Sequence, residues 1–247
     1  MSTKGIGARL TRKEDGRYMR GRGNFVGDMA MSGLKEVAFL RSPVAHAKIE
    51  GIEIPDAIRA RVFHNADMKG VRPMRPAASL PGFKQSDFPA LAADKVRYVG
   101  EMIAACVADT RAEAEDLVEQ IIVDFDELPV LANIVDAQKP GATLIHEEWG
   151  DNVFVVTSRD DDIDAVAKTA PVKVTRTYDM ARQTMNPMEG AGCLAYWDER
   201  MGQLVLYSST QAPHLIRTGL AEHLELEQRQ VRVIAPDVGG GFGYKCV

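Results

Sequence analysis

The sequence predicts an α+β protein, and two observations lead to this prediction. Short apolar stretches that are typical of strands recur along the chain. They alternate with segments whose apolar residues return at helical spacing, most clearly Ala114, Leu117 and Ile121. The 247 residues, of which 45% are hydrophobic, are enough for one or two domains with a buried core.

The predicted strands are short runs of β-branched, aromatic and other apolar residues. The clearest is the continuous apolar run 102–108, which is typical of a buried strand. Between Met68 and Pro89, four prolines and two glycines predict a long loop. In chain order, we expect strands at residues 37–40, 49–54, 59–63, 102–108, 121–125, 172–178, 204–207 and 231–235.

Three helices are predicted from their start signals. Asp109 or Thr110 can cap a helix after the run 102–108, and this helix with its two flanking strands predicts a compact crossover unit. The acidic residues 160–162 precede a second helix. Negative charges at a helix start interact favourably with the helix dipole, so we expect a helix cap there and not a metal site. Pro213 is expected at the first position of a third helix.

Composition excludes several classes of protein. Thirty basic residues against 35 acidic ones give a net charge of −5, which offers no general attraction for nucleic acid. No apolar run approaches the roughly 20 residues of a membrane-spanning helix, and the polar N-terminus is unlike a signal peptide. The three cysteines are far apart, which favours neither disulfides nor zinc and indicates a reducing, cytoplasmic setting.

The N-terminal segment, residues 1–30, differs from the rest of the chain. It carries seven basic and three acidic side chains among many glycines, so it has little apolar surface to bury. A solvated tail and a docking arm for another subunit explain this composition equally well. We expect the segment to contact a partner subunit instead of packing in the core of the α+β domain whose pattern begins at Glu36.

Three polar or glycine-rich segments are candidates for a ligand site. The first, here called the glycine loop, is Gly239–Gly243, which holds four glycines in five positions directly after a predicted strand. Glycines allow the backbone to approach a ligand closely, although a tight structural turn would explain them nearly as often. The second is Gln211, with the alternative of an ordinary helix cap. The third is Glu189 in a loop that its proline and glycine could explain as a simple turn.

The order of these segments resembles the molybdenum-binding large subunit of the xanthine dehydrogenase and aldehyde oxidase family. The pair formed by Ser209–His214 and Asp237–Lys245, at its separation along the chain, is the most specific part of the match. Further matching segments are Gly21–Asp28, Arg41–Ile49, Tyr98–Ala108, Ala114–Asp116 and Asn186–Glu189. The resemblance extends over nearly the whole chain.

This resemblance implies a particular fold, an α/β hammerhead domain followed by the start of the first molybdenum-cofactor-binding domain. The expected divisions are an N-terminal arm (1–20), the hammerhead (21–132), a linker (133–158) and a partial molybdopterin-binding domain (159–247). The family's large subunits are several times longer. We therefore expect the chain to be a fragment or one part of a split subunit.

The resemblance also implies site residues. Gln211 matches the glutamine whose amide reaches an oxo ligand of molybdenum, and Phe242 matches the loop position beside the metal. The expected cofactor-binding residues are Gln211, Gly240, Gly241, Phe242 and Gly243. Cys246 stands where purine-hydroxylating relatives carry a substrate-binding Glu, which makes a purine substrate doubtful. The family's catalytic Glu, a general base, is expected outside this chain.

The implied activity is the oxidative hydroxylation of an aldehyde or an N-heterocycle with oxygen from water. The implied cofactor is molybdenum-molybdopterin, in bacteria usually its cytosine dinucleotide form. Electrons would leave through [2Fe–2S] clusters and FAD in partner subunits, because this chain has no cysteine cluster for them. The alternative is a truncated, non-catalytic docking or scaffold module of the same fold.

Overall fold

The computed structural model describes residues 5–76, 78–158 and 161–246, and it divides the chain into two compact units. The described residues of the first unit are 5–32, 183–222 and 226–246. The second unit takes in residues 33–182 with 223–225.

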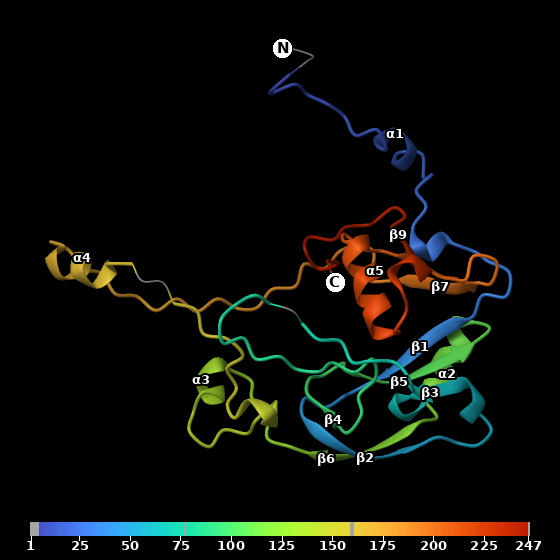
Figure 1. Ribbon diagram of the computed structural model, residues 1–247, viewed down its shortest axis with the longest axis horizontal. Coiled ribbons are helices and arrows are strands. Elements are labelled where there is room, and N and C mark those ends of the chain that lie inside the picture. The colour runs from blue at the N-terminus through green and yellow to red at the C-terminus, as the bar shows by residue number, and fades with distance from the viewer. Residues whose placement is uncertain (1–4, 77, 159–160, 247) are drawn as a thin grey trace. The chain divides into compact units, whose positions relative to one another are not determined.

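One sheet of the second unit is built around the predicted apolar strand. Strand β5 (Met102–Ala108) lies between β1 (Glu36–Arg41) and β3 (Val62–His64), antiparallel to both (Figure 1). Helix α2 (Arg111–Val118) follows β5 and begins with a capping box, because Thr110 Oγ1 accepts from the Glu113 N–H at 3.3 Å. The predicted strands 37–40 and 102–108 and the predicted helix after them are confirmed.

A second sheet of the same unit has the order β4–β2–β6. These strands are β4 (Lys95–Val96), β2 (Ala47–Glu53) and β6 (Ile122–Glu127). The predicted crossover unit is wrong in one respect, since β5 and β6 flank α2 but belong to different sheets. Strand β5 contributes to two cores: its Ala104 and Cys106 pack with the buried side of α2, while Ile103 packs with Val96.

Two other predicted strands differ from the structure. Residues Arg59–Arg61 form a 3₁₀ turn, so only the end of the expected strand 59–63 is extended. Residues 172–178 form no strand, and Val172, Val174 and Tyr178 are 76%, 74% and 83% exposed. The physical reason is that a strand needs a neighbour for its backbone hydrogen bonds, and no described strand pairs with this segment.

The helices of the second unit also include α3 (Ile134–Ala137) and α4 (Ile163–Thr169). Asp162 occupies the position before α4, but its side chain forms no capping hydrogen bond, and Asp160 lies outside the described residues. Among the described residues of both units, the 3₁₀ turns are η1 (Val26–Asp28), η2 (Arg59–Arg61), η3 (Asn65–Asp67), η4 (Glu147–Trp149) and η5 (Gln228–Gln230).

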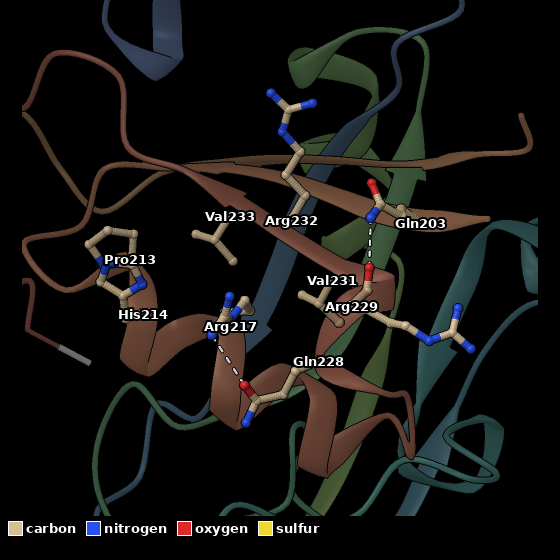
Figure 2. Close-up of a pocket in the computed structure, with 9 residues that line it drawn as sticks. All are labelled: Gln203, Pro213, His214, Arg217, Gln228, Arg229, Val231, Arg232 and Val233. Carbon is tan, nitrogen blue, oxygen red and sulfur yellow. Dashed lines mark hydrogen bonds between the residues drawn. The ribbon is translucent and has the colours of Figure 1, made fainter. Parts of the chain in front are cut away.

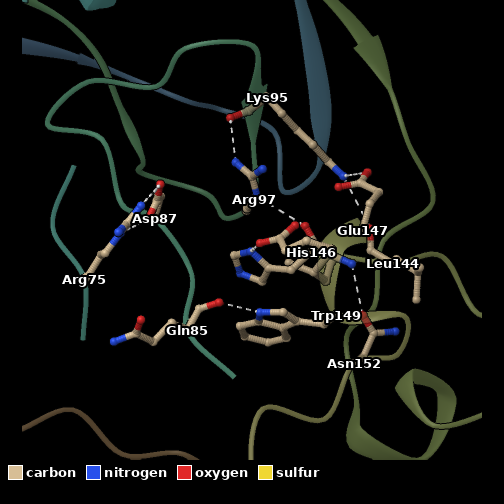
Figure 3. Close-up of polar contacts among 12 residues, drawn as sticks. Arg75, Gln85, Asp87, Lys95, Arg97, Leu144, His146, Glu147, Trp149 and Asn152 are labelled. Carbon is tan, nitrogen blue, oxygen red and sulfur yellow. Dashed lines mark hydrogen bonds and ion pairs between the residues drawn. The ribbon is translucent and has the colours of Figure 1, made fainter. Parts of the chain in front are cut away.

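The segment predicted as a linker, 133–158, is bonded to the sheets of the second unit. Lys95 on β4 has a side chain only 6% exposed, and its ammonium lies 2.6 Å from Glu147 (Figure 3). The Trp149 indole N–H donates to the Gln85 carbonyl at 2.7 Å, and the Trp149 ring stacks on His146. Burial next to Arg97 lowers the pKa of His146, which favours its neutral form.

The first unit holds a three-stranded sheet with the order β7–β8–β9. Strands β7 (Cys193–Asp198) and β8 (Gln203–Ser208) form an antiparallel hairpin, while β9 (Val231–Ile234) lies parallel to β8. Helix α5 (Pro213–His223) connects β8 to β9 and begins at the predicted proline (Figure 1). The short helix α1 (Asp15–Tyr18) also belongs to this unit.

Candidate functional site

The sheet topology of the first unit brings three candidate segments to one edge. Because β8 and β9 are parallel neighbours, their carboxyl ends meet at the same edge, so Gln211 after β8 lies near the glycine loop after β9. Strand β7 runs the other way and starts opposite Ser208, the last residue of β8. Glu189, which precedes β7, therefore reaches this edge too. All three segments, predicted separately from sequence, are in contact in the structure.

The Gln211 side chain is oriented by the backbone of the loop. Its Oε1 accepts from the N–H groups of Gly243, at 3.0 Å, and of Lys245, at 3.4 Å. Since both partners are donors, the oxygen must face them, and the amide NH₂ faces away. Gln211 is exposed, and its NH₂ group has no hydrogen-bond partner among the described residues. The site thus presents a free amide donor in a fixed orientation.

The glycines of the loop are required for two different reasons. Gly240 and Gly243 have φ of +98° and +84°, in the left-handed region that favours glycine. At Gly241 the reason is space, because a Cβ there would lie 2.4 Å from the Gln211 amide. Phe242 adopts a φ of +51° and is 69% exposed, so a non-glycine residue is held in a strained conformation at the tip.

Three consecutive backbone donors of the loop are free. Within the part of the chain that the structure describes, the N–H groups of Gly240, Gly241 and Phe242 have no hydrogen-bond partner. The flanking N–H groups are used internally, by Glu189 at one end and by Gln211 at the other. Successive N–H groups in such a turn can bind an anionic or oxygen-rich group.

Glu189 and Lys245 form a buried ion pair behind the loop. The ammonium of Lys245 lies 2.9 Å from Glu189 Oε2, and the two side chains are 2% and 19% exposed. The same carboxylate oxygen accepts from the Gly239 N–H at 2.7 Å. The other oxygen, Oε1, is buried without a hydrogen-bond partner among the described residues.

Asp237, at the base of the loop, is held by residues from the N-terminal segment. It pairs with the guanidinium of Arg17 and accepts from the Tyr18 hydroxyl at 2.9 Å and from the Asn24 N–H at 2.8 Å. The hydrogen bond from Arg17 is the main cause that holds the pKa of Asp237 well below its usual range. Part of residues 1–30 therefore packs in the first unit, beside the loop.

Of the residues of the glycine loop, only Gly239 lines either of two pockets described for the first unit. A pocket of about 500 Å³ is lined by residues that include Tyr18, Phe25 and Gly239. Another, of about 420 Å³, is lined by residues of α5 and β9, with the Arg217 guanidinium donating to Gln228 at 3.1 Å (Figure 2). None of the predicted site residues lines this second pocket.

Comparisons with known proteins assign both parts of the chain. Residues 20–129 match the sequence model described as the aldehyde oxidase and xanthine dehydrogenase a/b hammerhead domain. Residues 145–247 match the model of the molybdopterin cofactor-binding domain. The chain belongs to the xanthine dehydrogenase and aldehyde oxidase family. The predicted fold, a hammerhead followed by the start of a molybdenum-cofactor-binding domain, is confirmed.

Individual relatives of this family align along nearly the whole chain. The carbon monoxide dehydrogenase large chain of Hydrogenophaga pseudoflava is 34% identical, over 99% of this chain and 32% of the relative. The nicotine 6-hydroxylase large subunit of Paenarthrobacter nicotinovorans is 35% identical, over 98% of this chain and 30% of the relative. The chain thus spans about a third of the length of these relatives.

A solved structure also matches nearly the whole chain. The quinoline 2-oxidoreductase of Pseudomonas putida 86 matches with a TM-score of 0.90 and 34% identity, over 97% of this chain and 31% of that one. Among the described residues of our chain, no helix is both long enough and apolar enough to cross a membrane.

Sequence reasoning predicted the loop, Gln211 and Glu189 as candidates. It did not predict that Lys245 would contact Glu189 or that Arg17 would bind at the base of the loop. Lys245 stood at the end of the matching segment, yet nothing in its neighbours indicated that it would be buried. Arg17 was counted only as part of a basic segment, and no local pattern connected it with Asp237, which lies 220 positions further along the chain. Cys246, predicted on the substrate side, is half-buried next to Lys245.

Proposed function

We propose that this chain is the N-terminal portion of the molybdenum-binding subunit of a molybdenum hydroxylase. The reaction would be the oxidative hydroxylation of an aldehyde or an N-heterocycle with oxygen from water. The observation that carries the proposal is the edge where β8 and β9 end, which places the Gln211 amide against the glycine loop. Family membership and the matched molybdopterin-binding domain support it.

The residues at this edge fit an oxygen-rich, anionic cofactor. The Gln211 NH₂ group is an outward-facing donor, and the N–H groups of Gly240 to Phe242 are free donors beside it. The positive φ of Gly240 and Gly243 leaves the backbone open to close approach. This donor set suits oxo and phosphate groups and offers no anionic ligand that would repel them.

In this proposal, Gln211 and the glycine loop bind and orient the molybdenum cofactor, which supplies the redox chemistry when bound. Gln211 would donate from Nε2 to an oxo group, while its Oε1 remains bonded to the loop. Phe242, exposed at the tip, would exclude water from one side of the site. Cys246 would line the substrate side as a small apolar group.

The rest of the machinery would come from outside these residues. A general base must lie within about 2.6–3.2 Å of its proton, and we propose that a Glu in the remaining part of the molybdenum subunit has this role. Partner subunits would carry [2Fe–2S] clusters and FAD, and the cofactor would be the cytosine dinucleotide form. We also propose a cytoplasmic location, where free thiols such as Cys193 persist.

The test is to purify the complete enzyme that contains this chain and to measure bound molybdenum, pterin and dye reduction. Aldehydes and N-heterocycles such as quinoline and nicotine form the substrate panel, with ¹⁸O-water to trace the oxygen. Stoichiometric molybdenum and ¹⁸O in the product are expected. A complex that folds without molybdenum would contradict the proposal and favour a scaffold module instead.

A second measurement uses the 247-residue chain alone. Because it offers only one wall of the site, we expect it to retain no stoichiometric molybdenum and to show no turnover. Retention of the cofactor by the isolated chain would show that the pocket does not need the remaining part of the subunit.

A further inference from the structure

We propose that Glu189 and Lys245 are a pair of positioning residues that fix the shape of the glycine loop for the cofactor. This inference rests on the proposed function and assigns a role to two residues that are not among the proposed cofactor-binding residues. It starts from one atom, Glu189 Oε2, which bonds to both sides of the loop.

The geometry places this pair across the base of the loop. Glu189 Oε2 accepts from the Gly239 N–H at 2.7 Å, at the start of the loop, and from Lys245 Nζ at 2.9 Å, two residues beyond its end. The Glu189 N–H also donates to the Gly239 carbonyl at 3.2 Å. Residues six positions apart are thereby tied to one carboxylate, which limits the conformations of the chain between them.

The close packing at Gly239 supports the same conclusion. A Cβ at this position would lie 2.5 Å from the Cβ of Glu189, well inside any ordinary contact. The two backbones can be this close only because residue 239 is glycine. Glu189 and the start of the loop therefore pack as one unit.

The pair also acts on Gln211 through the backbone of Lys245. The Lys245 carbonyl accepts from the Gln211 N–H at 2.8 Å and from the Thr210 hydroxyl at 3.1 Å. Its N–H donates in turn to Gln211 Oε1. A displaced Lys245 would therefore turn the Gln211 amide, which carries the outward-facing donor.

Burial explains why an ion pair is used here and not an apolar contact. The Lys245 side chain is 2% exposed, and buried ion pairs are generally no more stabilising than well-packed hydrophobic residues. What such a pair can provide is one preferred geometry, because the Gly239 N–H and the Lys245 ammonium must both reach Glu189 Oε2. The pair is thus better suited to fixing the loop than to stabilising the fold.

The experiment compares four forms of the complete enzyme: wild type, Glu189→Gln, Glu189→Leu/Lys245→Met and the control Lys95→Met. The double variant replaces both charges with apolar side chains, so no buried charge is left alone. Lys95→Met removes another buried lysine of an ion pair, in the second unit. Each form is assayed for melting temperature, molybdenum and pterin content, and turnover. The cofactor-free subunit is assayed for amide hydrogen exchange of residues 239–245.

We expect the double variant to melt near the wild-type temperature, to lose protection of these amides and to lose cofactor. Its kcat per subunit should fall about 10- to 100-fold, as is usual when groups that support metal-site residues are removed. Glu189→Gln should change in the same direction, and Lys95→Met should keep wild-type exchange at the loop and full cofactor content.

The inference is overturned if the double variant keeps both wild-type exchange and full cofactor content. If the double variant does not fold, Glu189→Gln decides the question by the same two readouts. A wild-type enzyme without molybdenum would contradict the proposed function, while exchange in the cofactor-free subunit would still decide the role of the pair.

Discussion

Substituting alanine at individual glycines tests whether the loop is shaped by its contacts. Gly239 and Gly241 have no positive φ, so alanine there adds only the volume of a methyl group. At Gly239 the new Cβ would meet Glu189 Cβ at 2.5 Å, against about 3.5–4.0 Å for an ordinary carbon contact. At Gly241 it would meet the Gln211 amide at 2.4 Å.

The two substitutions should differ in cost because their neighbours differ in freedom. The backbone that carries Glu189 Cβ is hydrogen-bonded to Gly239, so this Cβ cannot move away alone. Gly239→Ala therefore pushes the two backbone segments apart. Overpacking of this kind costs about 1–3 kcal/mol, and a weakened hydrogen bond adds about 1 kcal/mol. The end of Gln211 can instead rotate away, so Gly241→Ala loses mainly two hydrogen bonds, about 1–2 kcal/mol in all.

Gly190 provides a matched control in the same unit. It has no positive φ, and a Cβ there would meet nothing within 4 Å. Alanine restricts the unfolded chain, so Gly190→Ala should be neutral or stabilising by about 0.4–1 kcal/mol. The expected order of stability is therefore Gly190→Ala, then Gly241→Ala, then Gly239→Ala.

The assay is urea denaturation followed by tryptophan fluorescence. The chain has two tryptophans, and Trp149→Phe leaves Trp197 on β7 as a reporter of the first unit. In the complete enzyme, Gly241→Ala should also lower turnover far more than its stability loss accounts for, because it displaces Gln211. Equal free energies of unfolding for the three variants would refute the reasoning.

Three further predictions follow from other contacts. Because the pKa of Asp237 is lowered in the folded state, its ion pair stabilises above the unfolded pKa of about 4, and this stabilisation is lost as pH falls from about 5. The difference in melting temperature between wild type and Asp237→Asn should thus shrink as pH falls from 7 to 3. A difference that stays constant over this range would argue against a stabilising ion pair at Asp237. Gln211→Ala should lower turnover of the complete enzyme on the order of 100-fold at full molybdenum content, and unchanged turnover would remove its proposed role. Glu147→Gln should lower the melting temperature more than Lys95→Met, because it leaves a 6%-exposed ammonium unpaired, whereas Lys95→Met leaves a largely exposed carboxylate.

Local sequence signals predicted the elements whose stability is local. The run Met102–Ala108 was predicted with its observed bounds because every residue is apolar and both faces of β5 are covered. Thr110 was one of the two expected caps of α2 because capping depends on residues three apart. The hairpin strand β7 was missed, although Gly202 marks the turn that joins it to β8.

Contacts between distant residues could not be predicted in this way. A strand at 172–178 has the right residues but lacks a partner among the described strands, and sequence patterns do not report partners. The family resemblance, which Gln211 and the glycine loop help to carry, predicted that both belong to one site. No periodicity connects either of them with Arg17 or with the burial of Lys245, since these depend on the folded arrangement.

The hydrogen bonds of Asp237 to Arg17 and Asn24 join segments from the two ends of the sequence within the first unit. The first unit joins residues more than 200 positions apart, so the second unit is an insertion within its chain. During synthesis at about 5–20 residues per second, Arg17 leaves the ribosome on the order of 10–40 s before Asp237. The hammerhead strands can pair within that interval because nearly all of their partners have been made. The N-terminal segment, in contrast, must wait until synthesis has passed Asp237, so Arg17 stays without this partner for that time.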